Sequence, residues 1–250
     1  MVSPPEPDHD QFRAQSLNYA YGGFPALSDV SISVREGEVL AVCGPRGSGK
    51  TTLLQCLAGQ LLPAEGGEIW LADIPLHALS ASARERVRRE HFGWIDTDPQ
   101  LVPELNGWEN AALPLLMRGV GHGAAKAVAL EWLERLDIGG CARKRPAALL
   151  HGQRQRIAVA RGLCAEPTVL FADDPTARLH RTDGVHVLRT MLAAARSHGI
   201  TVLLATHDPE AAAHADRTLR LIDGRSGEAA APPPAVPESA EGRPACSLSV

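Results

Sequence analysis

Residues 44–52 read Gly44-Pro45-Arg46-Gly47-Ser48-Gly49-Lys50-Thr51-Thr52, and this stretch decides the fold. The apolar run Val39–Cys43 precedes it and the helix-like run Leu53–Ala58 follows it, so the order is strand, glycine-rich loop, helix. That order and the spacing G-x-x-x-x-G-K-[ST] are those of a P-loop. Glycines let backbone N–H groups turn inward, and the N-terminus of the following helix adds partial positive charge. The motif therefore predicts a site for the phosphates of a nucleotide.

Two side chains of this loop have the chemistry that a nucleoside triphosphate and its metal ion require. The ammonium group of Lys50 can reach the β- and γ-phosphates, and the hydroxyl of Thr51 can ligate Mg²⁺. A P-loop also needs an acidic residue at the end of a neighbouring strand to hold the Mg²⁺. Asp173 follows the continuous apolar run Val169–Ala172 and supplies that residue. The sequence thus predicts a combined triphosphate and Mg²⁺ site.

The composition bounds the class of protein and its environment. The 250 residues suffice for one large domain or a domain with a subdomain, and the net charge of -4 gives no basic surplus that would indicate nucleic acid as a partner. Five cysteines occur without a C-x-x-C pair, which favours reduced thiols in a cytosolic compartment. The proline-rich, acidic start of the chain is unlike a signal peptide, and no run of about 18 apolar residues occurs. Any role at a membrane is therefore expected to go through a partner.

Strands and helices alternate along most of the chain, which predicts an α/β fold with a parallel sheet. Continuous apolar runs predict buried strands at Thr168–Ala172 and Ile200–Ala205, and shorter patterns predict further strands at Phe92–Ile95 and Thr218–Ile222. Helical patterning predicts helices at Ser80–Glu90, Glu109–Arg118, Ala124–Leu136, Gln155–Leu163 and Gly184–His198.

The segments on either side of the P-loop unit predict a small antiparallel sheet beside this core. Strand-like pieces at Phe12–Asn18 and Val30–Val34 flank a turn, and Gly66–Leu71 supplies another strand. The stretch Arg35–Glu38 is expected to form a hairpin turn into the strand before the P-loop. The two ends of the chain, residues 1–11 and 227–250, have compositions that predict disorder.

Four motifs, taken together, resemble those of the nucleotide-binding subunit of an ATP-binding-cassette (ABC) transporter. They are the P-loop, the run Gly152–Arg161, the stretch Asp173-Asp174-Pro175-Thr176 and the stretch Ala205-Thr206-His207-Asp208. Their order and spacing match the family over about residues 12–225. Within it, Leu101–Leu105 and Glu109–Gly119 most resemble the branch that serves macrolide-export and lipoprotein-release permeases.

The resemblance implies a fold and a working context. The fold is a P-loop NTPase core with a parallel sheet, an antiparallel β subdomain and an inserted α-helical subdomain at about residues 98–165, all within a cassette spanning residues 12–226. The implied ligands are ATP and Mg²⁺, and the implied activity is ATP hydrolysis. The implied partners are a second cassette, identical or different, and a separate integral membrane permease. The permease would hold the chain at the cytoplasmic face of the cell membrane.

The resemblance also assigns roles to individual residues. Tyr21 stands where the family stacks an aromatic ring on adenine, and Gly44–Thr52 stand where it binds the phosphates. Thr51 and Asp173 match its Mg²⁺ positions. His207 matches the histidine that contacts the γ-phosphate, and Thr97 occupies the place of a glutamine that senses both the permease and the metal.

Four positions depart from the family pattern. Asp174 replaces the glutamate that polarises the attacking water, and Thr97 replaces the glutamine just named. His180 replaces an aspartate in a loop that crosses the dimer interface. The fourth departure is in the signature that caps the partner's ATP, Leu-Ser-Gly-Gly-Gln in the family and Leu149-Leu150-His151-Gly152-Gln153 here.

These departures predict slow ATP hydrolysis. Asp174 shortens the carboxylate arm by one methylene, on the order of 1.5 Å, and a misplacement of about 1 Å can cost roughly a hundredfold in rate. Leu150 cannot donate a side-chain hydrogen bond to phosphate. His151 adds a Cβ where the family has glycine, which predicts backbone strain, although its imidazole could donate to phosphate instead.

Other functions remain open at this point. The first alternative is a regulatory cassette that binds ATP without hydrolysing it, and measured hydrolysis by an Asp174→Glu variant would distinguish the two. A soluble ABC protein of DNA repair or translation is disfavoured because the chain has one cassette and no heptads. A small-molecule P-loop kinase would leave the Gln153–Arg161 helix and His207 unexplained.

Overall fold

A computed structural model describes residues 10–227 of the chain. The predicted lead and tail fall largely on residues 1–9 and 228–250, which lie outside the described residues. The lead was predicted to extend to residue 11, and this is wrong for Asp10 and Gln11, because both belong to the first strand, β1 (Asp10–Tyr21). None of the described helices is long and apolar enough to cross a lipid bilayer.

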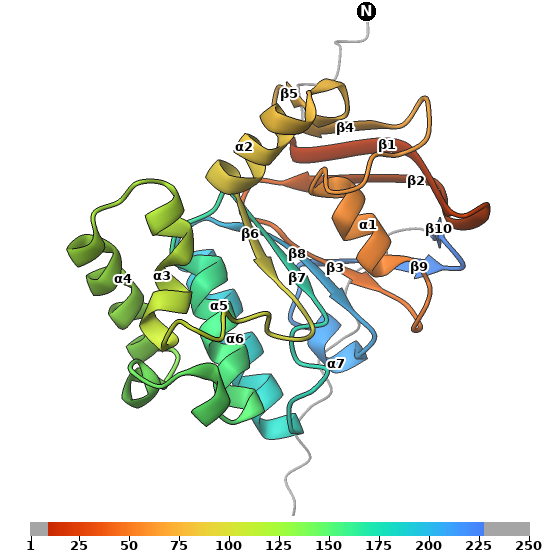
Figure 1. Cartoon of the computed structure of the whole chain (residues 1–250). Helices are drawn as coiled ribbons and strands as arrows, with labels where there is room; N and C mark the ends of the chain where they lie inside the picture. The colour runs from red at the N-terminus through yellow and green to blue at the C-terminus, as the bar shows by residue number, and fades with distance from the viewer. Residues whose placement is uncertain (1–9, 228–250) are drawn as a thin grey trace, which may run out of the picture.

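The centre of the molecule is a six-stranded sheet (Figure 1). Its order is β10-β9-β3-β8-β7-β6. Neighbouring strands from β9 to β6 run parallel, and β10 pairs antiparallel with β9. The bounds are β3 (Val39–Cys43), β6 (Phe92–Ile95), β7 (Val169–Asp173), β8 (Thr201–Thr206), β9 (Arg217–Ile222) and β10 (Arg225–Ser226). The predicted α/β fold with a parallel sheet is confirmed.

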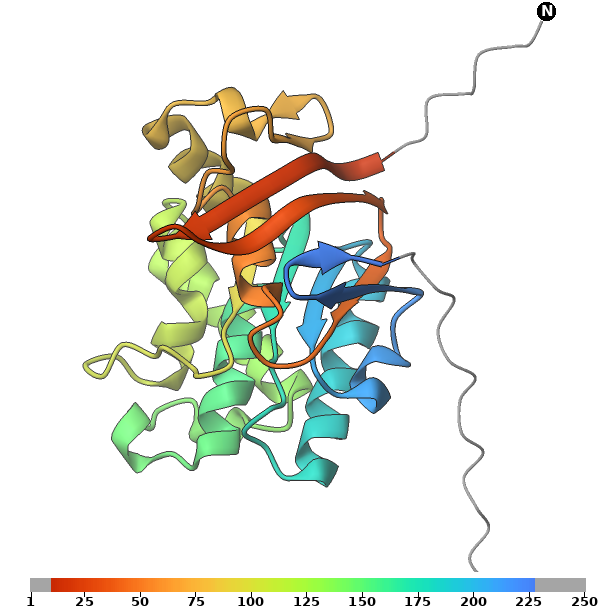
Figure 2. The same cartoon turned by 90° about the vertical axis from the view of Figure 1, so that its right-hand side faces the viewer.

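A second sheet lies across one side of the first and is antiparallel throughout (Figure 2). Its order is β2-β1-β4-β5, with β2 (Phe24–Arg35), β4 (Glu68–Leu71) and β5 (Ile74–Pro75) joining β1. The predicted hairpin at Arg35–Glu38 is wrong. The chain does turn there, but β2 and β3 belong to different sheets, so the turn carries the chain from one layer to the other.

The helices cover both faces of the parallel sheet, as Figure 1 shows. Helix α1 (Lys50–Leu57) lies between the two sheets, and α2 (Ala81–His91) packs near β6. Helices α3 (Gly107–Met117) and α4 (His122–Arg135) pack together on one side of α5 (His151–Leu163). The remaining elements are α6 (Arg181–Ser197), α7 (Pro209–Ala212) and short 3-10 turns at Leu76–Ala78, Gly139–Cys141 and Pro146–Ala148.

Two apolar cores lie on the two faces of the parallel sheet. Alternate residues of β3 divide between them, with Val39 and Ala41 facing the α3–α6 side and Leu40 and Val42 facing α1 and the antiparallel sheet. Because both faces are covered, the parallel strands read as continuous apolar runs rather than alternating ones. Each fully buried leucine or phenylalanine, such as Leu40 or Phe171, contributes about 1.5–3 kcal/mol relative to an exposed side chain. The two cores thus fix the carboxyl ends of β3, β7 and β8 at one edge, where the candidate site is found.

Candidate nucleotide and metal site

The phosphate loop connects the end of β3 at Cys43 to the start of α1 at Lys50. Gly49 is the N-cap of α1 and has a φ of 100°, a conformation that residues with a Cβ rarely adopt. A Cβ added to Gly49 would lie 2.5 Å from the carbonyl oxygen of Ala26 in β2. The loop therefore depends on glycine both for its shape and for its close packing against β2.

A turn near the end of the described chain supports the same loop from outside. The backbone N–H of Gly224 donates to the carbonyl of Ser48 at 3.0 Å, and the carbonyl of Gly224 accepts from the N–H of Ser28 at 2.8 Å. Gly224 has a φ of 74°, and a Cβ there would lie 2.6 Å from the oxygen of Ala26. The sequence does not reveal this role of Gly224, whose only local signal is the dipeptide Asp223-Gly224 between two strands.

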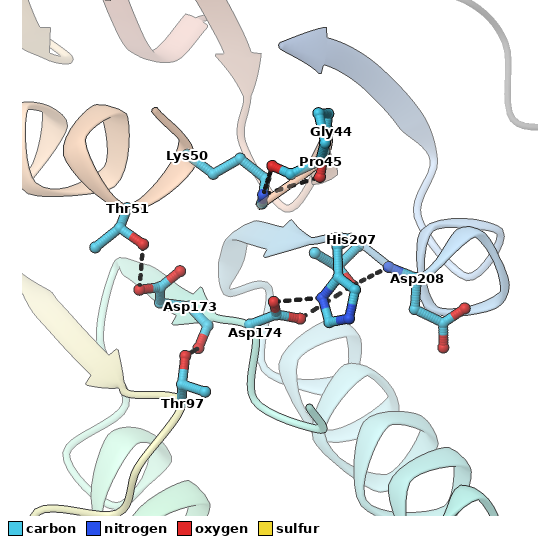
Figure 3. Close-up of polar contacts among 10 residues, drawn as sticks. Gly44, Pro45, Lys50, Thr51, Thr97, Asp173, Asp174, His207 and Asp208 are labelled. Carbon is cyan, nitrogen blue, oxygen red and sulfur yellow. Dashed lines mark hydrogen bonds and ion pairs between the residues drawn. The ribbon is translucent and has the colours of Figure 1, made fainter. Parts of the chain in front are cut away.

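Lys50 is folded over the phosphate loop (Figure 3). Its Nζ donates to the carbonyl oxygens of Gly44 at 2.9 Å and Pro45 at 2.8 Å, and the residue is 7% exposed. The loop carbonyls hold the ammonium group in place beside the backbone N–H groups at the start of α1. This combination of a fixed cation and a helix N-terminus forms a site for an anion.

Thr51, Asp173 and Thr97 come together at the ends of three elements (Figure 3). The Thr51 hydroxyl donates to Oδ2 of Asp173 at 2.8 Å, and the Thr97 hydroxyl donates to the backbone carbonyl of Asp173, also at 2.8 Å. Thr97 lies just past β6, whereas Asp173 is the last residue of β7. The three residues predicted for the metal are therefore neighbours.

The environment of Asp173 suits a cation. Burial is the main cause that raises the pKa of this carboxyl above its ordinary value of 3.8, and the hydrogen bond from Thr51 opposes that effect. The nearby carboxylates of Asp174 and Asp96 raise the pKa further, and the ammonium of Lys50 lowers it. A hydroxyl and a carboxylate are hard oxygen ligands of the kind that Mg²⁺ prefers. The residues present therefore fit a magnesium ion, whose charge would offset the negative charge gathered here.

Asp174 and His207 form a direct pair. Oδ2 of Asp174 lies 2.6 Å from Nδ1 of His207, and Oδ1 lies 3.4 Å from the Thr206 hydroxyl, which donates to it. Asp174 has a φ of 47°, in the left-handed region that aspartate tolerates better than most residues, and its N–H donates to the carbonyl of Ala205 at 2.8 Å. The two predicted catalytic residues are thus joined across the ends of β7 and β8. Thr206 belongs to the stretch Ala205–Asp208, but its contact with Asp174 was not predicted.

The signature residues span the start of α5, which begins at His151 and not at Gln155 as predicted. Leu150 is the N-cap and is 74% exposed, and its backbone N–H donates to Oε1 of Gln153 at 3.0 Å. The strain expected at His151 is absent, because the residue sits in the helix and its φ is not positive. Its Nε2 is buried and has no hydrogen-bond partner among the described residues.

The surroundings of the signature are separate from the phosphate loop. A cavity of about 370 Å³ is lined by Leu150, His151, Gly152 and Gln153, whereas Leu149 is buried. The other wall of this cavity comes from the segment that contains His180, the exposed N-cap of α6. Within one chain, the signature therefore lies on a surface apart from the phosphate loop, whereas His180 also borders the cavity that Asp174 and His207 line.

Tyr21, the predicted adenine-stacking residue, ends β1 beside the phosphate site. Its hydroxyl lies 3.5 Å from the hydroxyl of Thr52 in the first turn of α1. Its ring packs nearly edge-on against Tyr19, with centroids 4.9 Å apart, and the residue is 49% exposed. The ring is thus held close to the loop while much of its surface stays accessible.

Comparisons with known proteins agree with this arrangement. The sequence profile of the ABC transporter family matches residues 27–177, more than half of the chain. The ABC transporter ATP-binding protein YbbA of Escherichia coli strain K12, itself uncharacterised, is 40% identical over 204 residues, which cover 82% of this chain and 89% of that protein. The lipoprotein-releasing system ATP-binding protein LolD of Paramagnetospirillum magneticum is 38% identical over 200 residues, covering 79% of this chain and 87% of LolD.

Solved structures give the same result. The dimeric structure of MJ0796, a bacterial ABC transporter cassette, has a TM-score of 0.82 at 29% identity and covers 88% of this chain and 98% of that one. A dimeric post-hydrolysis state of MJ0796 bound to ADP and Pi has a TM-score of 0.81, also at 29% identity, with the same coverage. Fold, site geometry and sequence relatives coincide, and the chain belongs to the ABC transporter family of ATP-binding cassettes.

Proposed function

We propose that this chain is the ATP-binding subunit of an ABC transporter and that it binds ATP with Mg²⁺ but hydrolyses it slowly. The observation that carries the binding is the contact between Thr51 and Asp173, at 2.8 Å, directly below the loop that holds Lys50. A hydroxyl, a buried carboxylate and an ammonium group within one loop and one strand end match the parts that a P-loop ATPase uses.

Each part has a physical role in binding. The N–H groups at the start of α1 and the ammonium of Lys50 bind the phosphates. Thr51 and Asp173 hold the Mg²⁺, with Thr97 beside them. When bound, the ion neutralises charge on the phosphate oxygens. Tyr21 supports the base.

Asp174 is the candidate for orienting and polarising the attacking water, and His207 positions its carboxylate. Because the arm of Asp174 is short and its Oδ2 is hydrogen-bonded to His207, its reach toward the γ-phosphate is limited. A general base contributes about 10²–10⁴ in rate, so a misplaced one slows hydrolysis without removing it. Leu150 has no side-chain donor for the phosphate of a partner's ATP, and the weaker contact also slows hydrolysis.

The partners follow from the family. Two cassettes, identical or different, would close around ATP, and the helical subdomain at about residues 98–165, which contains α3, α4 and α5, would transmit that closure to an integral membrane permease. Bound to such a permease, the chain would work at the cytoplasmic face of the cell membrane. The similarity to LolD and YbbA favours a permease of the lipoprotein-release and macrolide-export branch.

The experiment measures ATP binding and phosphate release by the purified chain and by Asp174→Glu. We expect the wild type to bind ATP with Mg²⁺ and to release phosphate slowly, and we expect glutamate to raise the rate by about tenfold or more, because it restores the longer arm. Asp174→Asn serves as the matched control, since it keeps the size of the side chain and removes the charge.

The outcome separates the two candidate functions. Phosphate release by neither the wild type nor Asp174→Glu, with ATP binding intact, would favour the regulatory cassette that does not hydrolyse ATP. A wild-type rate equal to that of a relative with glutamate at this position would contradict slow turnover. Loss of ATP binding in a Lys50→Ala variant ties both readouts to the phosphate loop.

A further inference from the structure

The tip of the β1–β2 hairpin carries an aromatic side chain that the fold does not use. Phe24, the first residue of β2, is 80% exposed, the highest value among the exposed large hydrophobic side chains of residues 10–227. The turn before it consists of Gly22 and Gly23, both with positive φ, as in a type I′ hairpin turn. Phe24 is paired across the hairpin with Tyr21. Because directly paired residues of antiparallel strands project to the same face, the two rings share one face.

That face borders the phosphate loop. The Tyr21 hydroxyl lies 3.5 Å from the hydroxyl of Thr52, next to the metal-site residue Thr51. Two residues after Phe24, the carbonyl oxygen of Ala26 lies against Gly49 so closely that a Cβ there would be 2.5 Å away. Both strands of the hairpin tip therefore lie against the P-loop unit, β1 through Tyr21 and β2 through Ala26.

The rings of Tyr21 and Phe24 differ in their contacts with other aromatic rings. Tyr21 packs on Tyr19, with ring centroids 4.9 Å apart. Phe24 makes no ring contact with any other residue of the described chain. An exposed phenylalanine leaves apolar surface in water, and a planar ligand that covers it removes that surface from water.

The chemistry of the tip determines what it can distinguish. Residues 20–26 read Ala-Tyr-Gly-Gly-Phe-Pro-Ala. The hydroxyl oxygen of Tyr21 is the only polar side-chain atom in this segment. That oxygen is directed at Thr52. No side chain of the tip is therefore available to read the hydrogen-bonding edge of a base, whereas aromatic faces stack on any base.

We propose that Phe24 is a base-binding residue, and that with Tyr21 it selects nucleotides by stacking area rather than by hydrogen bonds. Purine triphosphates then bind better than pyrimidine triphosphates, and adenine and guanine bind alike. The proposal rests on the function proposed above, in which the P-loop holds a nucleoside triphosphate.

The test is a set of binding titrations on the full chain with Mg²⁺, using ATP, GTP, CTP and inorganic tripolyphosphate. The variants are Phe24→Ala, Phe24→Trp, which keeps an aromatic face, and the control Met117→Ala, which removes a side chain that is 65% exposed on α3. We expect Phe24→Ala to weaken ATP and GTP binding about fivefold to tenfold, as for the loss of one stacking contact. CTP binding should fall less and tripolyphosphate binding should stay unchanged. Phe24→Trp and Met117→Ala should bind ATP as the wild type does.

Two results would overturn the proposal. One is an ATP affinity of Phe24→Ala indistinguishable from that of the wild type, which would leave Phe24 as a contact for a protein partner. The other is an equal loss for ATP and tripolyphosphate, which would mean that the change acts on the loop and not on the base. A wild-type chain that binds none of the four ligands would instead contradict the proposed function itself.

Discussion

Two adjacent carboxylates, Asp173 and Asp174, stand in different surroundings at the end of β7. Asp173 is 8% exposed and accepts a hydrogen bond from Thr51. Asp174 contacts His207 and Thr206 at the end of β8. Because neighbouring residues at a strand end project differently, one carboxylate faces the phosphate loop and the other faces β8. The same residue type can therefore serve the metal at one position and the water at the next.

Asp173→Asn is expected to stabilise the nucleotide-free chain at neutral pH while removing its metal site. Burial raises the pKa of Asp173, so the ionised form that exists at neutral pH is the unfavourable one in the folded state. The favourable contribution of this group is full below its unfolded pKa and is lost as the pH rises through the higher folded value. We expect the variant to melt about 2–4 °C higher, roughly 1 kcal/mol for a protein of this size.

Thermal melts between about pH 4 and pH 8 check this, since the difference between variant and wild type should shrink as the pH falls. ATP with Mg²⁺ should raise the melting temperature of the wild type and leave that of Asp173→Asn nearly unchanged. A variant that melts below the wild type at neutral pH would mean that the ionised carboxylate stabilises the fold.

At the scale of the element, α5 begins with half of a capping box. Gln153 at the third helical position accepts from the N–H of Leu150, but the side chain of Leu150 has no oxygen to accept a hydrogen bond in return. The first N–H groups of the helix therefore have no side-chain cap. By contrast, α3 has the complete arrangement, in which Asn106 and Glu109 accept from each other's backbone N–H groups at 3.1 Å and 2.8 Å.

Leu150→Ser is expected to raise the free energy of unfolding by about 1 kcal/mol, because serine completes the capping box. Urea denaturation measures the change, and Leu150→Ala is the matched control, since it removes the exposed apolar side chain without adding a hydroxyl. Equal stability of the serine and alanine variants would show that the cap is not formed.

The accuracy with which the sequence predicts the bounds of these elements differs between buried strands, the long hairpin and α5. Parallel strands such as β6 and β7 are located to within about one residue, because strands buried on both faces are continuous apolar runs. The strands β1 and β2 are longer than predicted, since shifts of register on both sides of Tyr19 interrupt the alternation near their hairpin. The start of α5 is missed because neither Leu150 nor His151 is a typical capping residue.

The site itself is predictable in its parts and not in its contacts. Lys50, Thr51 and Asp173 follow from motif and strand end, since a P-loop and an acidic strand end occupy one edge of a parallel sheet. The contact of Asp174 with His207 depends on β7 and β8 being neighbours, which spacing along the chain does not define. The turn at Arg35–Glu38 likewise has the composition of a hairpin turn. Composition does not determine whether the two flanking strands pair with each other, and β2 and β3 do not.

At the scale of the whole molecule, Arg118, the C-cap of α3, joins that helix to the end of α2 and to the segment after α5. Its guanidinium donates to the carbonyls of Arg89 and Glu90 at the end of α2 and to the carbonyl of Ala165 after α5, at 2.6–2.9 Å. Burial lowers the pKa of this side chain, and Glu90 opposes that effect. A planar group with several donors suits such a junction better than an ammonium. Movement of α3 is thereby linked to α2, the helix that directly precedes β6.

We expect ATP with Mg²⁺ to convert the purified chain from a monomer of 26.6 kDa to a dimer. The signature residues line a cavity that contains no residue of the phosphate loop, so a second cassette is needed to bring a signature to bound ATP. Sedimentation velocity with and without ATP measures the change, and Lys50→Ala is the control that should stay monomeric. A chain that binds ATP and remains a monomer would require a different cassette as its partner.

The contact of Gly224 with the phosphate loop has a consequence for synthesis of the protein. The motif at residues 44–52 is translated early, but the hydrogen bonds from Gly224 to Ser48 and from Ser28 to Gly224 join it to nearly the last residues of the described chain. A nascent chain therefore contains the complete nucleotide motif long before it contains the turn that holds the loop in shape. Since domains fold largely as units during synthesis, the capacity to bind nucleotide arises late, when the first and last parts of the cassette meet.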